Sequence, residues 1–257
     1  MPAGTRSATL GLALALLLLG CSSSQTATRA TPRPSGSATP SGGLDAGWIL
    51  HADNAGGFAV AFPDAWALAM SDSPTLSDDL AAIAAQQAEL GGFFTTAFAP
   101  SKTTGLVLLA ADPRTVASGF TTNASVFRSD LGPAARAPDL GAITQGKLGA
   151  LNKDSTITGT IDRRHVQLGG QDASRIAYVF KSGGTSVEVA SYLLVVDLGK
   201  NRLEYELTIG SAITDYAQLF DKVAATFVLG SFKTRPATPS PTISINPNGP
   251  GPATPSP

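Results

Sequence analysis

Cys21 is the only cysteine in the sequence, and it closes an apolar stretch that runs from Leu10 to Gly20. A thiol can form a thioether, and Gly20 leaves room for a peptidase at the bond before Cys21. The stretch is about ten residues long, half of what a helix needs to cross a hydrocarbon core of about 30 Å. It follows a short N-terminus in which Arg6 is the one charged side chain. This arrangement is typical of a secretory leader rather than a permanent span.

The end of this leader, Leu18-Leu19-Gly20-Cys21, resembles the lipobox of bacterial lipoproteins. The resemblance implies that residues 1–20 are a signal peptide and that a diacylglyceryl group with palmitate-type chains is attached to the Cys21 sulfur. At about 0.8 kcal/mol per buried CH2, two acyl chains hold a protein on a bilayer durably. We therefore expect Cys21 to be the lipid-attachment site and the chain to lie on the extracytoplasmic face of the cell membrane. A buried or free thiol is the alternative.

A second pattern, the stretch from Gly141 to Lys147, has the G-x-x-x-x-G-K spacing of a phosphate-binding loop. In such a loop a Ser or Thr hydroxyl follows the lysine and holds Mg²⁺. Leu148 stands at that position, and no predicted strand leads into the segment. We therefore expect no nucleotide partner.

The two histidines, His51 and His165, are the candidate metal ligands. Asp162 precedes His165 by three residues, so on a strand the two side chains point to opposite faces. The sequence has neither an H-E-x-x-H pattern nor a set of cysteine ligands, and we expect no metal and no cofactor.

Nucleophile patterns are missing as well, because no serine lies in a G-x-S-x-G elbow or begins an S-x-x-K pair. We therefore expect no enzymatic activity. A hydrolase built from an isolated serine and one of the histidines remains an alternative, since triads are defined by geometry. Three acids, Glu188, Glu204 and Glu206, either line a carboxylate pocket or form the solvated face of a sheet. The solvated face is the more common arrangement.

The chain divides by composition into a leader, a tether, one domain and a tail. Residues 21–43 and 234–257 are rich in Ser, Thr and Pro and cannot bury enough apolar surface to order themselves. The domain between them, residues 44–233, is long enough to form its own core. A formal net charge of −1 gives no electrostatic basis for binding nucleic acid.

In the first half of the domain, a turn at Pro63–Trp66 is expected to lead into a short strand. Ser77 is expected to cap a helix that ends at Gly91-Gly92. The other strands expected here are Trp48–Leu50, Phe58–Phe62, Phe93–Ala99, Thr104–Asp112 and Thr121–Arg128. A glycine-rich helix is expected over Pro138–Leu151.

The second half alternates between apolar and polar residues with a period of two, which indicates strands. Short glycine turns make these strands antiparallel, and a final amphipathic helix is expected over Thr214–Phe227. The four strands expected are Ser155–Leu168, Ala173–Lys181, Ser186–Asp197 and Arg202–Gly210. The pattern predicts an α+β domain, an antiparallel β-sheet with helices packed against it.

Several short segments together resemble the PsbP/Mog1-like superfamily and are most similar to LpqN-type bacterial lipoproteins. They are Gly57-Phe58, Phe62–Trp66, Leu168–Ala173, Tyr205–Thr208, Tyr216–Val223 and Ser231-Phe232. Ala65 stands where the family's turn commonly has glycine. The resemblance implies an α/β/α-type sandwich around an antiparallel sheet. It also implies a role in binding partners or supporting assemblies, and it carries over no catalytic residue.

These expectations combine into a lipid-anchored extracytoplasmic lipoprotein that acts as a non-catalytic binding or accessory module of the cell envelope. Its partner would be an envelope protein or an amphiphile held against the sheet, or between the sheet and the helices. One alternative is a carrier of a lipid or small apolar ligand, which requires a deep apolar pocket. A further alternative is an envelope hydrolase, which requires Ser, His and acid side chains in one cleft.

Overall fold

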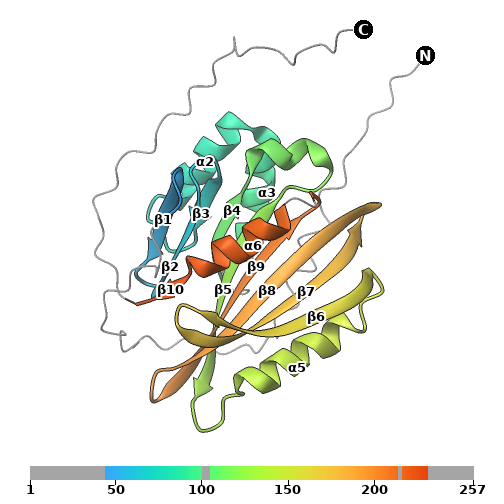
Figure 1. The fold of residues 1–257 in the computed structure, drawn as a ribbon. Coiled ribbons are helices and arrows are strands. Elements are labelled where there is room, and N and C mark those ends of the chain that lie inside the picture. Colours follow the sequence, from blue (N-terminus) through green and yellow to red (C-terminus); the bar gives the residue numbers. More distant parts are fainter. Residues whose placement is uncertain (1–43, 100–104, 214–215, 231–257) are drawn as a thin grey trace, which may run out of the picture.

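A seven-stranded antiparallel sheet forms the middle layer of the structure, a computed structural model that describes residues 44–99, 105–213 and 216–230 (Figure 1). Its order across the sheet is β3-β4-β5-β9-β8-β7-β6. The strands are β3 (Ala67–Met70), β4 (Leu106–Ala111), β5 (Asn123–Pro133), β6 (Ile157–Leu168), β7 (Gln171–Ser182), β8 (Thr185–Asp197) and β9 (Asn201–Ser211). The leader 1–20, Cys21, the rest of the tether to residue 43, residues 231–233 and the tail 234–257 lie outside the described residues.

Alternation along β9 gives the sheet two different faces. Apolar side chains at odd positions from Leu203 to Ile209 are at most 9% exposed and point to one face, where the largest core cluster lies. The side chains of Glu204, Glu206 and Thr208 point to the opposite face, because successive residues of a strand alternate. We call these the odd face and the even face of β9.

The odd face is covered by a second, three-stranded sheet and by helix α6 (Ala217–Ala225). This small sheet has the order β1-β2-β10 and consists of β1 (Trp48–Asp53), β2 (Phe58–Pro63) and β10 (Val228–Leu229). Aromatic rings join the layers, since the Phe58 ring stacks 5.6 Å from that of Phe227 and lies 6.1 Å, edge on, from that of Tyr205. Buried aromatic pairs of this kind add to the stability given by area alone.

The even face carries three helices in two groups, each with its own hydrophobic cluster. Helices α2 (Leu76–Gln86) and α3 (Ala88–Phe98) pack on β3 and β4, and helix α5 (Leu140–Leu151) packs on β7 and β8. The short 3₁₀ helix η1 (Pro113–Ser118) connects β4 to β5. The architecture is thus the predicted α+β class, with helices on both faces of an antiparallel sheet (Figure 1).

The region around Gly91 and Gly92 corrects two predictions. The glycine pair does not end a helix but lies inside α3, and Phe93–Phe98, predicted as part of a strand, is helical. A Cβ on Gly91 would lie 2.4 Å from the Cβ of Ala84, so this glycine lets α3 cross close to α2. Leu90, Phe94, Ala97 and Phe98 are buried on one side, at the spacing of a helix. Packing of α3 therefore outweighs the tendency of two adjacent glycines to end a helix.

The predicted start of the first helix is also wrong, by two residues. Helix α2 begins at Leu76, with Thr75 at the N-cap position and no side-chain capping bond, so Ser77 lies within the first turn. The other predicted strands of both halves are present, although β5 continues to Pro133. The glycine-rich helix is present as α5. Residues 100–104, where two strands were expected to join, are not described.

Candidate functional site

Lys147 of the G-x-x-x-x-G-K stretch and Glu206 of the acidic set form an ion pair between α5 and β9. Lys147 Nζ donates to Glu206 Oε1 at 2.5 Å, although the two residues are 59 positions apart. Their side chains are only 14% and 12% exposed. Thr208 donates to the same Glu206 oxygen at 2.8 Å, and the Thr208 hydroxyl lies 2.9 Å from that of Ser191. These contacts form a buried polar row between α5 and the even face of the sheet.

The local sequence explains why Lys147 lies on a helix and not on a phosphate loop. Asp139 caps α5, because its Oδ1 accepts from the backbone N–H of Ala142 at 2.8 Å. From Leu140 onward the segment that has the G-x-x-x-x-G-K spacing is helical, with no strand or loop to cradle a phosphate. The Thr144 hydroxyl lies 3.0 Å from that of Ser174 on β7 and holds the helix against the sheet.

Glu204 and Glu206 lie on one face but differ in their ionisation. Burial raises the pKa of Glu204 to about 7, and the neighbouring charge of Glu206 adds to this effect while Lys147 opposes it. Burial also opposes ionisation of Glu206, but the Lys147 charge and hydrogen bond and the Thr208 hydroxyl leave its pKa below the usual value. Glu188 lies on the opposite face, since it pairs in register with Ser211. The three acids therefore do not line one pocket, and the solvated face that the sequence favoured is wrong at Glu206, whose side chain is only 12% exposed beneath α5.

The two histidines lie in different environments. His51 on β1 faces the interior with its ring 6.2 Å from that of Phe62, and burial lowers its pKa to about 4. His165 Nε2 lies 3.4 Å from Asp172 Oδ1 on the exposed end of β6, whereas Asp162 pairs with Arg164 at 2.8 Å. Among the described residues, no three His, Cys, Asp or Glu side chains cluster as a metal site would require.

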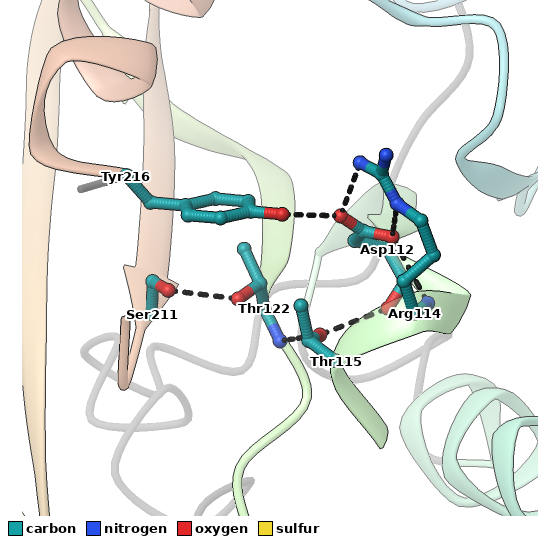
Figure 2. A network of polar contacts seen from close by, with 6 residues as sticks. All are labelled: Asp112, Arg114, Thr115, Thr122, Ser211 and Tyr216. Carbon is teal, nitrogen blue, oxygen red and sulfur yellow. Dashed lines mark hydrogen bonds and ion pairs between the residues drawn. The ribbon is translucent and has the colours of Figure 1, made fainter. Parts of the chain in front are cut away.

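A second polar network joins the ends of β4, β5 and β9 to the start of α6 around Asp112, whose side chain is fully buried (Figure 2). Asp112 accepts from Arg114 Nε at 2.9 Å, from Arg114 Nη2 at 2.8 Å and from the Tyr216 hydroxyl at 2.7 Å. Burial works against ionisation, but the hydrogen bonds from Arg114 and Tyr216 outweigh it and lower the pKa of Asp112.

The same network continues through hydroxyl groups. The Thr115 hydroxyl donates to the backbone carbonyl of Asp112 at 2.9 Å and accepts from the Thr122 N–H at 2.8 Å. The Thr122 hydroxyl lies 2.8 Å from that of Ser211 (Figure 2). Each Asp112 oxygen accepts from two donors, so its lone pairs are occupied within the network. The network thus holds the ends of β4, β5 and β9 together.

A cleft of about 520 Å³ opens between the C-terminal end of α5 and strand β6. The side chains of Leu148, Leu151 and Asn152 line it from the helix, and Asp154 lies in the connection that follows. Strand β6 contributes Ile157, the segment 159–161 and Arg163. This volume is within the range of small-ligand pockets. Nothing in the sequence indicated this cleft, because it depends on how a helix and an edge strand meet.

These elements define an α+β protein with helices on both faces of an antiparallel sheet, as the resemblance to the PsbP/Mog1-like superfamily implies. No protein-family profile and no curated protein sequence matches the chain. Among the described residues, none of the helices combines the length and apolarity needed to span a membrane.

Solved structures similar to this chain include the following two. One is cyanobacterial PsbP (CyanoP) from Synechocystis sp. PCC 6803, which is 15% identical over 76% of this chain and 98% of its own, with a TM-score of 0.44. The other is LpqN, involved in cell envelope biogenesis of Mycobacterium tuberculosis, which is 15% identical over 71% of this chain and 90% of its own, with a TM-score of 0.45. The PsbP and LpqN likeness is the one that the sequence segments predicted.

Proposed function

We propose that this chain is a lipid-anchored lipoprotein of the cell envelope, attached to the membrane through Cys21 and working as a non-catalytic binding module. The anchor is supported by the apolar leader that ends in Leu18-Leu19-Gly20-Cys21. LpqN is described as involved in cell envelope biogenesis, and an envelope role for this chain is proposed here on the basis of its own leader.

The observation that carries the binding role is the cleft between α5 and β6. It is concave and is lined by four aliphatic side chains, of which Leu151 is buried, together with four polar or charged residues and Gly159. A concave site that offers both aliphatic and polar groups suits a ligand that carries both kinds of group. The buried charges elsewhere, at Lys147, Glu206 and Asp112, are engaged with one another or with neighbouring groups and serve the fold.

The anchor is tested by labelling the full chain with an alkyne analogue of palmitate in its bacterial host. The wild type is expected to take up the label and to fractionate with membranes. Cys21→Ala is expected to lose both, whereas Ser22→Ala, a change at the next position, retains them. Equal labelling of wild type and Cys21→Ala would overturn the proposed anchor.

A carrier of a lipid or small apolar ligand is the second candidate function. The aliphatic side chains of Leu148, Leu151, Ile157 and Ile161 at the cleft favour it. Titration of the purified full chain with a fluorescent fatty acid tests this role. Saturable binding that weakens in Leu148→Ser would favour a carrier over a protein-binding module.

A further inference from the structure

Strand β6 is the outermost strand of the seven-stranded sheet, and its outer side has no neighbouring strand among the described residues. Its pairing with β7 is interrupted between Thr158 and Asp162, so residues 159–161 stand outside the ladder. Gly159 has φ +77°, a conformation that glycine adopts without strain. On the outer side of an edge strand, the backbone N–H and C=O groups have no strand to pair with and bind water or a ligand instead. The interrupted segment is also the part of β6 that lines the cleft.

The ionisable side chains of β6 lie in the middle of the strand. Asp162 to His165 carries four of them, which discourage pairing with another strand. The stretches on either side, Ile157–Ile161 and Val166–Leu168, carry none. The stretch beside the cleft therefore lacks the charges that protect the middle of this edge strand.

Arg163 is the cation at the rim of this cleft. It is exposed, and no carboxylate among the described residues forms an ion pair with it. The nearby acid in the lining, Asp154, is already engaged, because its Oδ1 accepts from the N–H and the hydroxyl of Thr156 at 2.8 and 2.7 Å. A guanidinium presents a planar set of donors that matches a carboxylate.

We propose that the cleft between α5 and β6 binds a short extended peptide of an envelope protein, with a carboxylate of that peptide at Arg163. The peptide backbone would hydrogen-bond to the outward-facing N–H and C=O groups of segment 159–161. Its apolar side chains would lie on Leu148, Leu151 and Ile161. This arrangement, a peptide strand between a sheet edge and a helix, gives affinity through main-chain bonds and specificity through side-chain contacts. The inference rests on the proposed binding function and names its partner class.

The composition of the lining favours a peptide over an acyl chain. Four of the nine lining residues are apolar, four are polar or charged, and one is glycine. An acyl chain offers no hydrogen bonds to Asn152 or Thr160, so it would leave them without partners when it excluded water. An extended peptide carries a donor and an acceptor at nearly every residue.

The test uses the purified full-length chain in detergent and a phage-displayed library of random heptapeptides. Wild type is expected to enrich peptides that combine one acidic position with β-branched neighbours. Synthetic versions of the enriched peptides, labelled with fluorescein, then give affinities by anisotropy. We expect Arg163→Gln to weaken binding about tenfold, the loss that corresponds to one charge-assisted contact. Arg164→Gln, which changes the next residue on the opposite face of β6, is the matched control and is expected to bind within about twofold of wild type.

Replacing the acidic residue by its amide, or amidating the peptide's C-terminus, distinguishes a side-chain carboxylate from a terminal one. The proposal is overturned if no peptide is enriched, or if Arg163→Gln binds as tightly as wild type. Binding of fluorescent palmitate that depends on Arg163, without any enriched peptide, would assign the cleft to an amphiphile instead. Cys21→Ala is expected to change membrane attachment and leave peptide affinity unchanged, so failure of the anchor and failure of the cleft are distinguishable.

Discussion

Lys147 on α5 and Glu206 on β9 form an ion pair that is almost entirely buried between the helix and the sheet. Neither residue has another ionic partner among the described residues within ion-pair distance. In such a position the two charges need each other, because removal of one leaves the other desolvated and unpaired. The pair is therefore the point at which α5 is most sensitive to substitution.

Lys147→Met is expected to lower the free energy of unfolding by about 3 kcal/mol, because it leaves the Glu206 carboxylate buried without its cation. Lys147→Met combined with Glu206→Met should recover most of this loss. Urea unfolding of the single and double variants measures the coupling. Lys153→Met, which removes an exposed lysine just beyond α5, is the control and should change stability little. Equal losses in the two single lysine variants would contradict the assigned burial.

Asp112→Asn is expected to destabilise the domain by about 2 kcal/mol, because the amide cannot accept all four hydrogen bonds that the buried carboxylate accepts. Tyr216→Phe removes one of these bonds and should cost about 1 kcal/mol. Arg114→Gln should cost less than Asp112→Asn, since 65% of the Arg114 side chain is exposed and solvent screens its charge. Thermal unfolding ranks the three variants, and a larger loss in Arg114→Gln would contradict this account.

Alanine substitutions at the two adjacent glycines of α3 should change stability in opposite directions. Gly91→Ala should destabilise by about 2 kcal/mol, because the new Cβ overlaps the backbone of Ala84 on the neighbouring helix. Gly92→Ala meets no atom within 4 Å and should stabilise by about 1 kcal/mol through helix propensity. Chemical denaturation of the two variants provides the measurement. If both substitutions stabilise, the close crossing of α2 and α3 is wrong.

His51 should make the fold sensitive to mild acid. Its pKa is about 4 in the folded state, so between pH 6.5 and 4 the unfolded chain binds more protons at this residue. Stability contributed by the neutral imidazole is thus complete above pH 6.5 and falls as pH drops toward 4. His51→Gln is expected to flatten that part of a stability-against-pH curve. His165→Gln, at an exposed histidine on β6, controls for the loss of a histidine as such.

Glu204 should have the opposite effect on the pH dependence of stability. With its pKa raised to about 7, the folded state binds more protons than the unfolded state between pH 4.5 and 7. Stability at this residue therefore decreases as pH rises through that range. Glu204→Gln is expected to be more stable than wild type at pH 8 and to lose that advantage at pH 4. The same substitution at Glu188, on the other face of the sheet, is the matched control.

The sheet could be predicted from the sequence because its signals are local. Alternation from Leu203 to Ile209, with glycine turns between the long strands, is enough to define four antiparallel strands. The helix α3 was missed because a Gly-Gly pair is a helix stop when only neighbouring residues are considered. The reason that Gly91 is helical lies in Ala84 of another helix, which no local pattern reveals.

The polar sites were harder to predict than the strands, because their residues are far apart in the sequence. Lys147 and Glu206 each belonged to a sequence pattern, but their pairing spans 59 positions. Asp112 was not singled out, because its partner Tyr216 is 104 positions away in the sequence. The cleft at Arg163 likewise arises where α5 ends beside an interrupted strand. A pattern of residue types identifies which groups can do chemistry, whereas the topology decides which of them meet.

The two hydrophobic clusters on the even face have a dynamic consequence. One joins α2 and α3 to β3 and β4, the other joins α5 to β7 and β8, and the polar side chains of Thr208 and Glu206 lie on the strand between them. We therefore expect α5 and the α2–α3 pair to unfold locally from the sheet independently of each other. In a native-state hydrogen exchange experiment, the amides of α5 should open as a unit of their own, admitting solvent to Glu206 while the central strands stay closed.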